Sequence, residues 1–163
     1  MLTQESLKKL FKYNPLDGSF LRLVTTSNNA RANTIAGCIS VQGYRVIRIG
    51  PKLYRTNRLA FLYMTGQFPV FHVDHKDGDT LNDRWLNLRE ATVSQNLANA
   101  KLRADNTSGY KSVTWFAARK KWMVKICVRG KHKTLGYTDN PVDGAAIYAE
   151  AAKKYFGEFA RVT

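Results

Sequence analysis

Residues 73–79 constrain the fold of this chain most strongly, because they set an acid directly beside a histidine where a strand runs into a turn. The strand is predicted over residues 71–74, and the turn is Asp77-Gly78-Asp79. Consecutive side chains in a strand face opposite ways. Asp74 and His75 can therefore serve one site only if the chain leaves the extended conformation near them, and the turn permits this.

The pair supplies two of the groups that hydrolysis of a phosphodiester needs. A carboxylate oxygen is a hard ligand suited to Mg²⁺, and an imidazole can act as a base near neutral pH. The histidine would deprotonate a water, and a divalent cation would neutralise the phosphate and stabilise the leaving oxygen. Taken alone, the short stretch could equally be an ordinary acidic turn. A calcium loop on Asp77 and Asp79 is disfavoured, because no glutamate stands at the required position.

Charge is distributed unevenly around this segment. The 163 residues have a net charge of +14. Residues 1–70 hold ten basic and two acidic side chains, residues 71–106 five and six, and residues 107–163 eleven and four. A balance this basic indicates a polyanionic partner, most often nucleic acid, although a generally basic protein is the alternative. Two basic flanks around an acidic centre suit a protein that grips phosphates on both sides of a cation site.

The two cysteines, Cys38 and Cys127, give neither a zinc spacing nor a disulfide framework. We therefore expect a reducing cytoplasm, which would be that of a bacterial host if the gene is carried by a phage. No signal peptide is recognisable at the start, and no apolar stretch approaches the length of a membrane span. We expect no membrane partner and no small-molecule substrate.

Helix and strand patterns predict an α+β protein of two modules. In the first, residues 1–100, helices are expected at 3–11, 57–65 and 92–100 and strands at 19–24, 43–49 and 71–74, with an irregular stretch at 82–88. Residues 101–107 are polar and read as a linker. In residues 108–163 three strands are expected at 110–116, 121–128 and 133–137. A helix then starts at the cap Asn140 with Pro141 in its first position and ends before Gly157. The second module is thus a three-stranded antiparallel sheet packed on one helix.

The spacing of the polar residues around His75 matches a known family. Asp74-His75-Lys76-Asp77-Gly78, then Asn87-Leu88-Arg89 twelve residues after the histidine, then Asn96 nine further on, resembles the HNH homing-type endonucleases. The segments at 58–69 and 13–18 resemble parts of the same phage-type proteins. The resemblance covers roughly residues 1–100.

The resemblance implies a ββα-metal module in which Asp74 and Asn96 hold one Mg²⁺ (or Mn²⁺) ion. His75 would be the general base, and Asn87 would orient its imidazole. The last ligand is His in many of these proteins and Asn here, but Asn still offers a hard oxygen. In the related proteins the helix that precedes the Asp-His pair often starts with His-Arg. This chain has Asn57-Arg58 there, so any role of that histidine is absent. Three further residues could support the centre: Asn82, Arg89 and Asn99.

The second module resembles the plant APETALA-type (ethylene-response-factor) DNA-binding domain. The resemblance lies in residues 108–113, Lys121-Trp122 with Ile126, Leu135-Gly-Tyr137 and the helix at 145–152. Members of that family lay the sheet in the DNA major groove. Alternation predicts an apolar face with Trp122, Val124, Ile126 and Val128 under the helix. The opposite face would bind DNA through Lys111, Thr114, Phe116, Lys121, Met123, Lys125, Arg129, His132 and Thr134.

Together these features predict a site-preferring, metal-dependent endonuclease that hydrolyses double-stranded DNA, homing-type and most simply nicking one strand. It would act as a monomer, or as a dimer where two coordinated cuts are made. One alternative is a DNA-binding protein whose nuclease centre is inactive. Another is an RNA-binding protein, which would bind RNA more tightly than duplex DNA.

Overall fold

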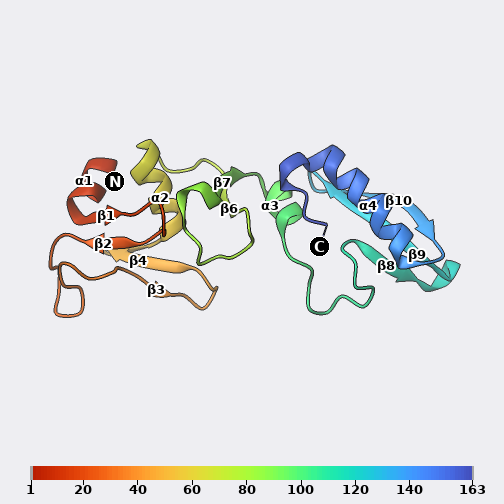
Figure 1. Cartoon of the computed structure of the whole chain (residues 1–163), viewed down its shortest axis with the longest axis horizontal. Coiled ribbons are helices and arrows are strands. Elements are labelled where there is room, and N and C mark those ends of the chain that lie inside the picture. Colours follow the sequence, from red (N-terminus) through yellow and green to blue (C-terminus); the bar gives the residue numbers. More distant parts are fainter. Residues whose placement is uncertain (1, 163) are drawn as a thin grey trace. The chain divides into compact units, whose positions relative to one another are not determined.

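The computed structural model describes residues 2–162, which form two compact units, Met1–Glu90 and Ala91–Thr163 (Figure 1). The sequence predicts a first module that extends to residue 100. In the structure the first unit ends at Glu90, because Ala91 and Ala98 are buried in the core of the second unit. The expected linker at 101–107 therefore also lies within the second unit.

The first unit combines two α-helices with three small sheets. The sheets are the pair β1–β2, the three-stranded β3–β4–β5 and the pair β6–β7. The elements are α1 Gln4–Leu10, β1 Phe11–Tyr13, β2 Phe20–Arg22, β3 Cys38–Ile39, β4 Arg45–Ile49, β5 Lys52–Arg55, α2 Thr56–Thr65, β6 His72–His75, the 3₁₀ turn η1 Trp85–Asn87 and β7 Leu88–Ala91.

Helix α1 begins where the sequence predicts it, with a capping box in which Thr3 and Ser6 exchange hydrogen bonds. The helix ends one residue earlier than predicted, because Phe11 leaves it to start β1 and pairs with Arg22 of β2. The β1–β2 hairpin carries Phe11 and Phe20 into the core. Since β1 is only three residues long and follows the helix directly, its alternation of buried and exposed residues is too short to predict a strand.

The β3–β4–β5 sheet and α2 complete the core of this unit. Strand β4 falls within the predicted residues 43–49, whereas β3 and β5 are not predicted, because they are short and carry little apolar alternation. Helix α2 presents Leu59 and Leu62 to the core and ends at Gly66 in the left-handed conformation. Its first residue, Thr56, is also buried, which matters for the site below.

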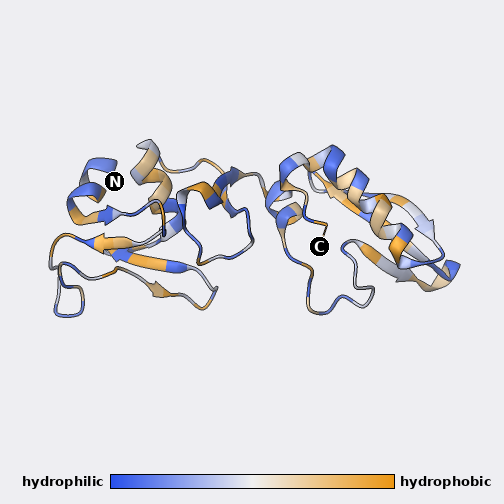
Figure 2. Cartoon of the chain, viewed as in Figure 1, coloured by the Kyte–Doolittle hydropathy of each residue, from blue (hydrophilic) through white to orange (hydrophobic). Residues whose placement is uncertain are grey.

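The second unit is a three-stranded antiparallel sheet in the order β10–β9–β8 with helix α4 on one face. Its elements are α3 Val93–Asn99, β8 Val113–Phe116, the 3₁₀ turn η2 Ala117–Arg119, β9 Lys121–Val128, β10 Lys131–Thr138, α4 Pro141–Phe156 and the 3₁₀ turn η3 Gly157–Phe159. Both α4 and the strands carry hydrophobic and hydrophilic residues side by side (Figure 2), as elements with one buried face do. The described residues agree in outline with the predicted sheet and helix, but the unit also contains α3, which the sequence predicts in the first module.

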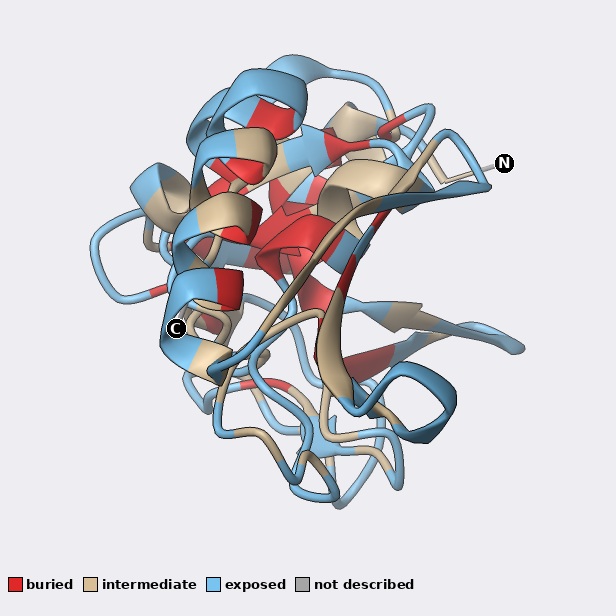
Figure 3. Ribbon diagram, turned by 90° about the vertical axis from the view of Figure 1, so that its right-hand side faces the viewer, coloured by how far each residue is buried: buried red, intermediate tan, exposed pale blue. Residues whose placement is uncertain are grey.

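Helix α4 lies close against the sheet. Its buried residues Gly144, Tyr148, Ala152 and Phe156 recur every four positions and follow one side of the helix (Figure 3). A Cβ at Gly144 would lie 3.1 Å from the side chain of Val124. The absence of a side chain at position 144 therefore permits this close approach.

Strand β10 is longer than predicted and contains an irregularity. The register shifts between Thr134 and Gly136, so that Thr134 pairs with Lys125 while Gly136 pairs with Val124. Such a bulge places one extra residue in a strand and reverses the alternation beyond it. Tyr137 therefore shares a face with Thr134, although simple counting would put the two on opposite faces.

Among the described residues, no helix combines the length and the apolar character that crossing a membrane would require.

Candidate active site

Asp74 and His75 are the last two residues of β6, and both are buried, each with 4% of its surface exposed. The strand ends at His75, one residue later than predicted, and the chain then turns at residues 76–78, close to the predicted turn at Asp77–Asp79. Buried ionisable side chains are costly unless they have polar partners. The partners of these two residues therefore define what the site can do.

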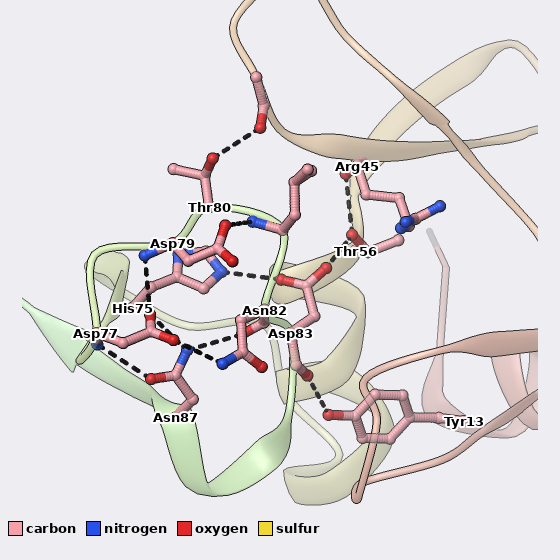
Figure 4. Close-up of polar contacts among 12 residues, drawn as sticks. Tyr13, Arg45, Thr56, His75, Asp77, Asp79, Thr80, Asn82, Asp83 and Asn87 are labelled. Atoms are coloured by element: carbon pink, nitrogen blue, oxygen red, sulfur yellow. Dashed lines mark hydrogen bonds and ion pairs between the residues drawn. The ribbon is translucent and has the colours of Figure 1, made fainter.

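The imidazole of His75 contacts a carboxylate that the sequence reasoning missed. Its Nε2 lies 2.9 Å from Oδ1 of Asp83, and Asp83 is itself only 2% exposed (Figure 4). The ring of Tyr44 lies beside the imidazole, at 6.3 Å between centroids. Asp83 stands in an irregular loop eight residues after the histidine, so neither helical nor strand periodicity indicates that the two meet.

Asp83 is fixed by three further segments of the first unit. The hydroxyl of Thr56, at the start of α2, contacts Oδ2 of its carboxylate. The phenol of Tyr13 donates to its backbone carbonyl at 2.7 Å. The turn after β1 approaches it so closely that a Cβ at Gly18 would lie 2.4 Å from the Asp83 carbonyl carbon. Burial first, and then the carboxylates of Asp83 and Asp17, raise the pKa of the Tyr13 phenol, so it remains a donor at neutral pH.

Asp74 pairs with a cation from the neighbouring strand. Nε of Arg89, in β7, donates to its Oδ2 at 2.8 Å, and both side chains are largely buried. The sequence places Arg89 among the residues that could support the centre. In the structure Arg89 makes a buried ion pair with Asp74. One oxygen of Asp74, the expected metal ligand, is therefore already bonded to Arg89.

Asn87 binds the loop that follows β6. The sequence predicts that it orients the imidazole, but its amide nitrogen instead donates to Oδ1 of Asp77 at 3.0 Å and to the carbonyl of Asn82 at 2.8 Å. Its side-chain oxygen accepts from the Asp77 N–H. Asn82 donates to the other Asp77 oxygen at 2.6 Å. The carboxylate that contacts the imidazole is that of Asp83 (Figure 4).

Asp77 is thus the centre of a small hydrogen-bonded loop. Burial acts to raise its pKa, but the Asp79 N–H and the amides of Asn82 and Asn87 outweigh it, so the pKa of this carboxyl lies below its usual value. An ionised Asp77 accepts all three bonds at neutral pH. Asn82 and Asn87 therefore stabilise the loop between β6 and β7, next to His75 in the sequence.

Asn96 and Asn99 lie on α3 and belong to the second unit. Asn96 is half-buried. Asn99 is buried, and its side-chain oxygen accepts a long hydrogen bond of 3.4 Å from Arg161. Helix α3 begins at Val93 and is capped by Thr92 through a capping box, within one residue of the predicted start.

Asp74 and Asn96 each offer an oxygen of the kind that a hard cation prefers. Among the described residues no cluster of three or more His, Cys, Asp or Glu side chains could hold a metal. The expected ligands are of another kind, one carboxylate from Asp74 and one amide oxygen from Asn96. Mg²⁺ takes few protein oxygens and keeps several waters, so these residue types fit it.

The sheet of the second unit has an outer face that α4 leaves uncovered. The register pairs Thr114 with Met123 and Phe116 with Lys121 on β8 and β9. It pairs Thr134 with Lys125 and His132 with Cys127 on β9 and β10. These residues share one face, as predicted. The bulge adds Tyr137, whose ring lies 5.8 Å from that of Phe116 and under the guanidinium of Arg119.

Two of the expected DNA contacts take other positions. Lys111 is half-buried, and its ammonium donates to the carbonyls of Ala98 and Ala100, both at 2.6 Å, which caps the end of α3. Lys111 is therefore a structural residue of the second unit. Arg129 lies in the two-residue turn between β9 and β10 with a positive φ, at the edge of the face.

Comparisons with known proteins identify the family of the segment that contains Asp74 and His75. Residues 54–98, which span α2 to α3 and include Asp74, His75 and Asp83, match the family model described as HNH endonuclease. The chain is 35% identical over 91 residues to Protein 3.8 of Escherichia phage T7, and the match covers 56% of this chain and 74% of that protein. The chain belongs to the HNH endonuclease family.

A solved structure of the HNH homing endonuclease I-HmuI, from work on its DNA binding and cleavage, is also similar. The TM-score is 0.41 and the sequence identity 24%, and the match covers 55% of this chain. It spans only half of the length of that chain.

Proposed function

We propose that this protein is a divalent-metal-dependent endonuclease that hydrolyses phosphodiester bonds in double-stranded DNA, cutting one strand at a preferred site. The observation that carries the proposal is the buried pair Asp74–His75 at the end of β6, inside the segment that matches the HNH endonuclease model. The net charge of +14 supports a polyanionic substrate.

In this proposal His75 is the general base. It accepts a proton from water, the water oxygen forms a bond to phosphorus, and the bond to the leaving oxygen breaks. The leaving oxygen then takes a proton from solvent. Asp74 and Asn96 would hold one Mg²⁺ or Mn²⁺, which neutralises charge on the phosphate when bound. Asn82, Asn87 and Asp77 would hold the loop between β6 and β7 in shape.

The second unit would supply binding to the duplex. We assign this to an APETALA-type sheet that binds with its outer face, through Thr114, Phe116, Lys121, Met123, Lys125, His132 and Thr134, with Arg129 at the edge. Lysines bind phosphates and guanine edges, while Thr and Met methyl groups meet thymine. Lys111 is left out, because its ammonium is committed to the end of α3.

A plasmid assay tests the nuclease proposal. Supercoiled DNA incubated with protein and Mg²⁺ should become open circles, EDTA should stop the reaction, and His75→Ala should slow it by about 10²-fold or more. His72→Ala, an exposed histidine on the same strand, is the matched control and should cleave normally. A linear product would indicate paired cuts by a dimer.

One observation favours an alternative, a DNA-binding protein whose nuclease centre is inactive. Arg89 neutralises Asp74, the carboxylate that should hold the metal. On that reading the folded protein binds duplex DNA equally well with and without metal and cleaves none of a large set of DNA substrates. Tighter binding to RNA than to duplex DNA would instead identify an RNA-binding protein.

A further inference from the structure

We infer that Asp83 is the positioning residue of His75: it holds the hydrogen of the neutral imidazole on Nε2 and thereby makes Nδ1 the basic nitrogen of the ring. The inference rests on the proposed nuclease function, since it assigns the nitrogen that takes the proton from water. Its starting point is the contact of 2.9 Å between Nε2 and Oδ1. Asp83 is 2% exposed and His75 4%.

The chemistry of the two groups fixes the tautomer. An ionised carboxylate accepts hydrogen bonds and cannot donate one, whereas a neutral imidazole has one donor and one acceptor nitrogen. Nε2 faces the carboxylate, so Nε2 carries the hydrogen. The lone pair then lies on Nδ1, which makes Nδ1 the basic atom of the proposed reaction.

The carboxylate is held at both of its oxygens. Oδ1 contacts the imidazole, and Oδ2 contacts the hydroxyl of Thr56. That hydroxyl also lies 2.9 Å from the carbonyl of Arg45 in β4. Rotation of the Asp83 side chain would therefore break contacts to two different elements.

The backbone of Asp83 is held equally well. Tyr13 donates to its carbonyl, and the turn at Gly18 touches it. The imidazole is thus oriented through a chain that reaches β1, β4 and α2. Orientation of this kind matters, because a misplaced general base loses most of its effect even when it is present.

Asn87 does not compete for this task. Both hydrogens of its amide are used on Asp77 and Asn82, and its oxygen accepts from the Asp77 N–H. A role for Asn87 at the ring would require this loop to break. Asp83 therefore takes the role that the sequence assigns to Asn87.

The substitution Asp83→Asn separates positioning from negative charge. An amide oxygen can still accept from Nε2–H, and the amide nitrogen can donate to the Thr56 hydroxyl, which then donates to the Arg45 carbonyl. Asp83→Ala removes both contacts. We expect Asp83→Asn to nick plasmid within about tenfold of the wild-type rate, and Asp83→Ala to be about 100-fold slower, with DNA affinity unchanged in EDTA. Asp105→Asn, an exposed carboxylate, is the control.

A spectroscopic measurement tests the arrangement without cleavage. The chain has three histidines, so ¹H–¹⁵N spectra of the imidazoles are simple, and His75→Ala identifies the signals of His75. In the metal-free wild type at a pH where the ring is neutral, Nε2 should be protonated, with a slowly exchanging downfield proton. That proton should persist in Asp83→Asn and vanish in Asp83→Ala.

The outcomes are distinguishable. A wild-type His75 with its hydrogen on Nδ1, or Nε2–H protection unchanged in folded Asp83→Ala, would overturn the inference. So would wild-type nicking by folded Asp83→Ala. The expected spectra together with no cleavage by the wild type would instead overturn the nuclease proposal and leave the positioning of the ring intact. Because the wild-type spectrum decides the tautomer, an Asp83→Ala variant that fails to fold does not block the test.

Discussion

The phenol of Tyr13 and the backbone carbonyl of Asp83 are hydrogen-bonded at 2.7 Å across 70 positions of the sequence. Removing the hydroxyl with Tyr13→Phe leaves the ring contacts with Phe20 and Tyr63 in place and leaves a buried carbonyl without this donor. We expect the free energy of unfolding to fall by about 1–2 kcal/mol, measured by chemical denaturation. Tyr155→Phe, which alters a partly exposed ring on α4, should change it little. Equal effects of the two would show that the bond to Asp83 contributes nothing.

Gly18 and Gly50 allow a matched test of the close approach to Asp83. Both have positive φ, but a Cβ at Gly18 would meet the Asp83 backbone at 2.4 Å, whereas a Cβ at Gly50 would meet nothing within 4 Å. Gly50→Ala should therefore show only the cost of the left-handed conformation, about 1–2 kcal/mol. Gly18→Ala should lower the free energy of unfolding by more than about 3 kcal/mol, because the backbone of Asp83 must move. Similar losses of unfolding free energy in the two variants would contradict the observed packing.

Arg89→Gln tests whether Asp74 can hold a cation. The variant removes the guanidinium from a buried carboxylate, so in EDTA the free energy of unfolding should fall by about 3 kcal/mol. If Asp74 binds a metal ion, Mg²⁺ or Mn²⁺ should restore part of this loss, and the metal-induced rise in Tm should be larger than in the wild type. If neither Mg²⁺ nor Mn²⁺ changes the Tm of the variant, Asp74 is not a metal ligand. Arg103→Gln, which removes an exposed pairing with Asp105, serves as the control.

Lys111 should give the second unit a distinctive pH dependence. Burial first, and then the charge of Arg161, lower its pKa from 10.5 to about 8 in the folded protein. Between pH 8 and 10.5 the unfolded chain therefore binds more protons than the folded one, and stability contributed at this site rises with pH. Comparison with Lys111→Met isolates the effect, and the difference in unfolding free energy should grow in favour of the wild type across that range.

The same variant also tests the cap on α3. Near pH 7, Lys111→Met should lose about 1–3 kcal/mol, because the carbonyls of Ala98 and Ala100 lose their donor. A difference that shrinks from pH 8 to 10.5 would mean that the carbonyls hold the ammonium charged and that its pKa is not lowered.

Lys125 lies exposed on the outer face of the sheet, opposite Thr134, and tests that face as the DNA contact. If its ammonium binds a phosphate, Lys125→Ala should weaken duplex binding for all sequences and reduce the slope of log K against log salt by about 1. Lys153→Ala, an exposed lysine near the end of α4, should leave the slope unchanged. A slope that responds to Lys153 and not to Lys125 would place the contact elsewhere.

The sequence predicts the helices and strands whose capping residues or apolar periodicity lie within a few residues, and it misses the short strands that lack such a pattern. Thr3, Thr92 and Asn140 start their helices as predicted, because capping depends on residues within one turn. The outer face of the sheet also follows, up to the bulge in β10, which puts Tyr137 on it. A bulge carries no residue signature here, so alternation alone could not locate it.

At the site the sequence identifies Asp74 and His75 but not the partners that hold them. The contact of Asp83 with His75 depends on an irregular loop supported by Tyr13, Gly18 and Thr56, and no periodicity connects these positions. Lys111 similarly follows a strand pattern that predicts a solvent-facing lysine. Its long side chain instead reaches the end of α3, a contact fixed by tertiary packing alone.

The support of Asp83 by the turn at Gly18 has a consequence for any attempt to move the site around Asp74 and His75 to another protein. The segment that matches the family model starts at residue 54, yet the loop that orients its histidine is braced by Tyr13 and Gly18. A graft of residues 54–98 would transfer Asp74, His75 and Asp83 without the residues outside this segment that support Asp83. A transplanted piece that keeps this support must therefore also include Tyr13 and Gly18, which lie about forty residues before the matched segment.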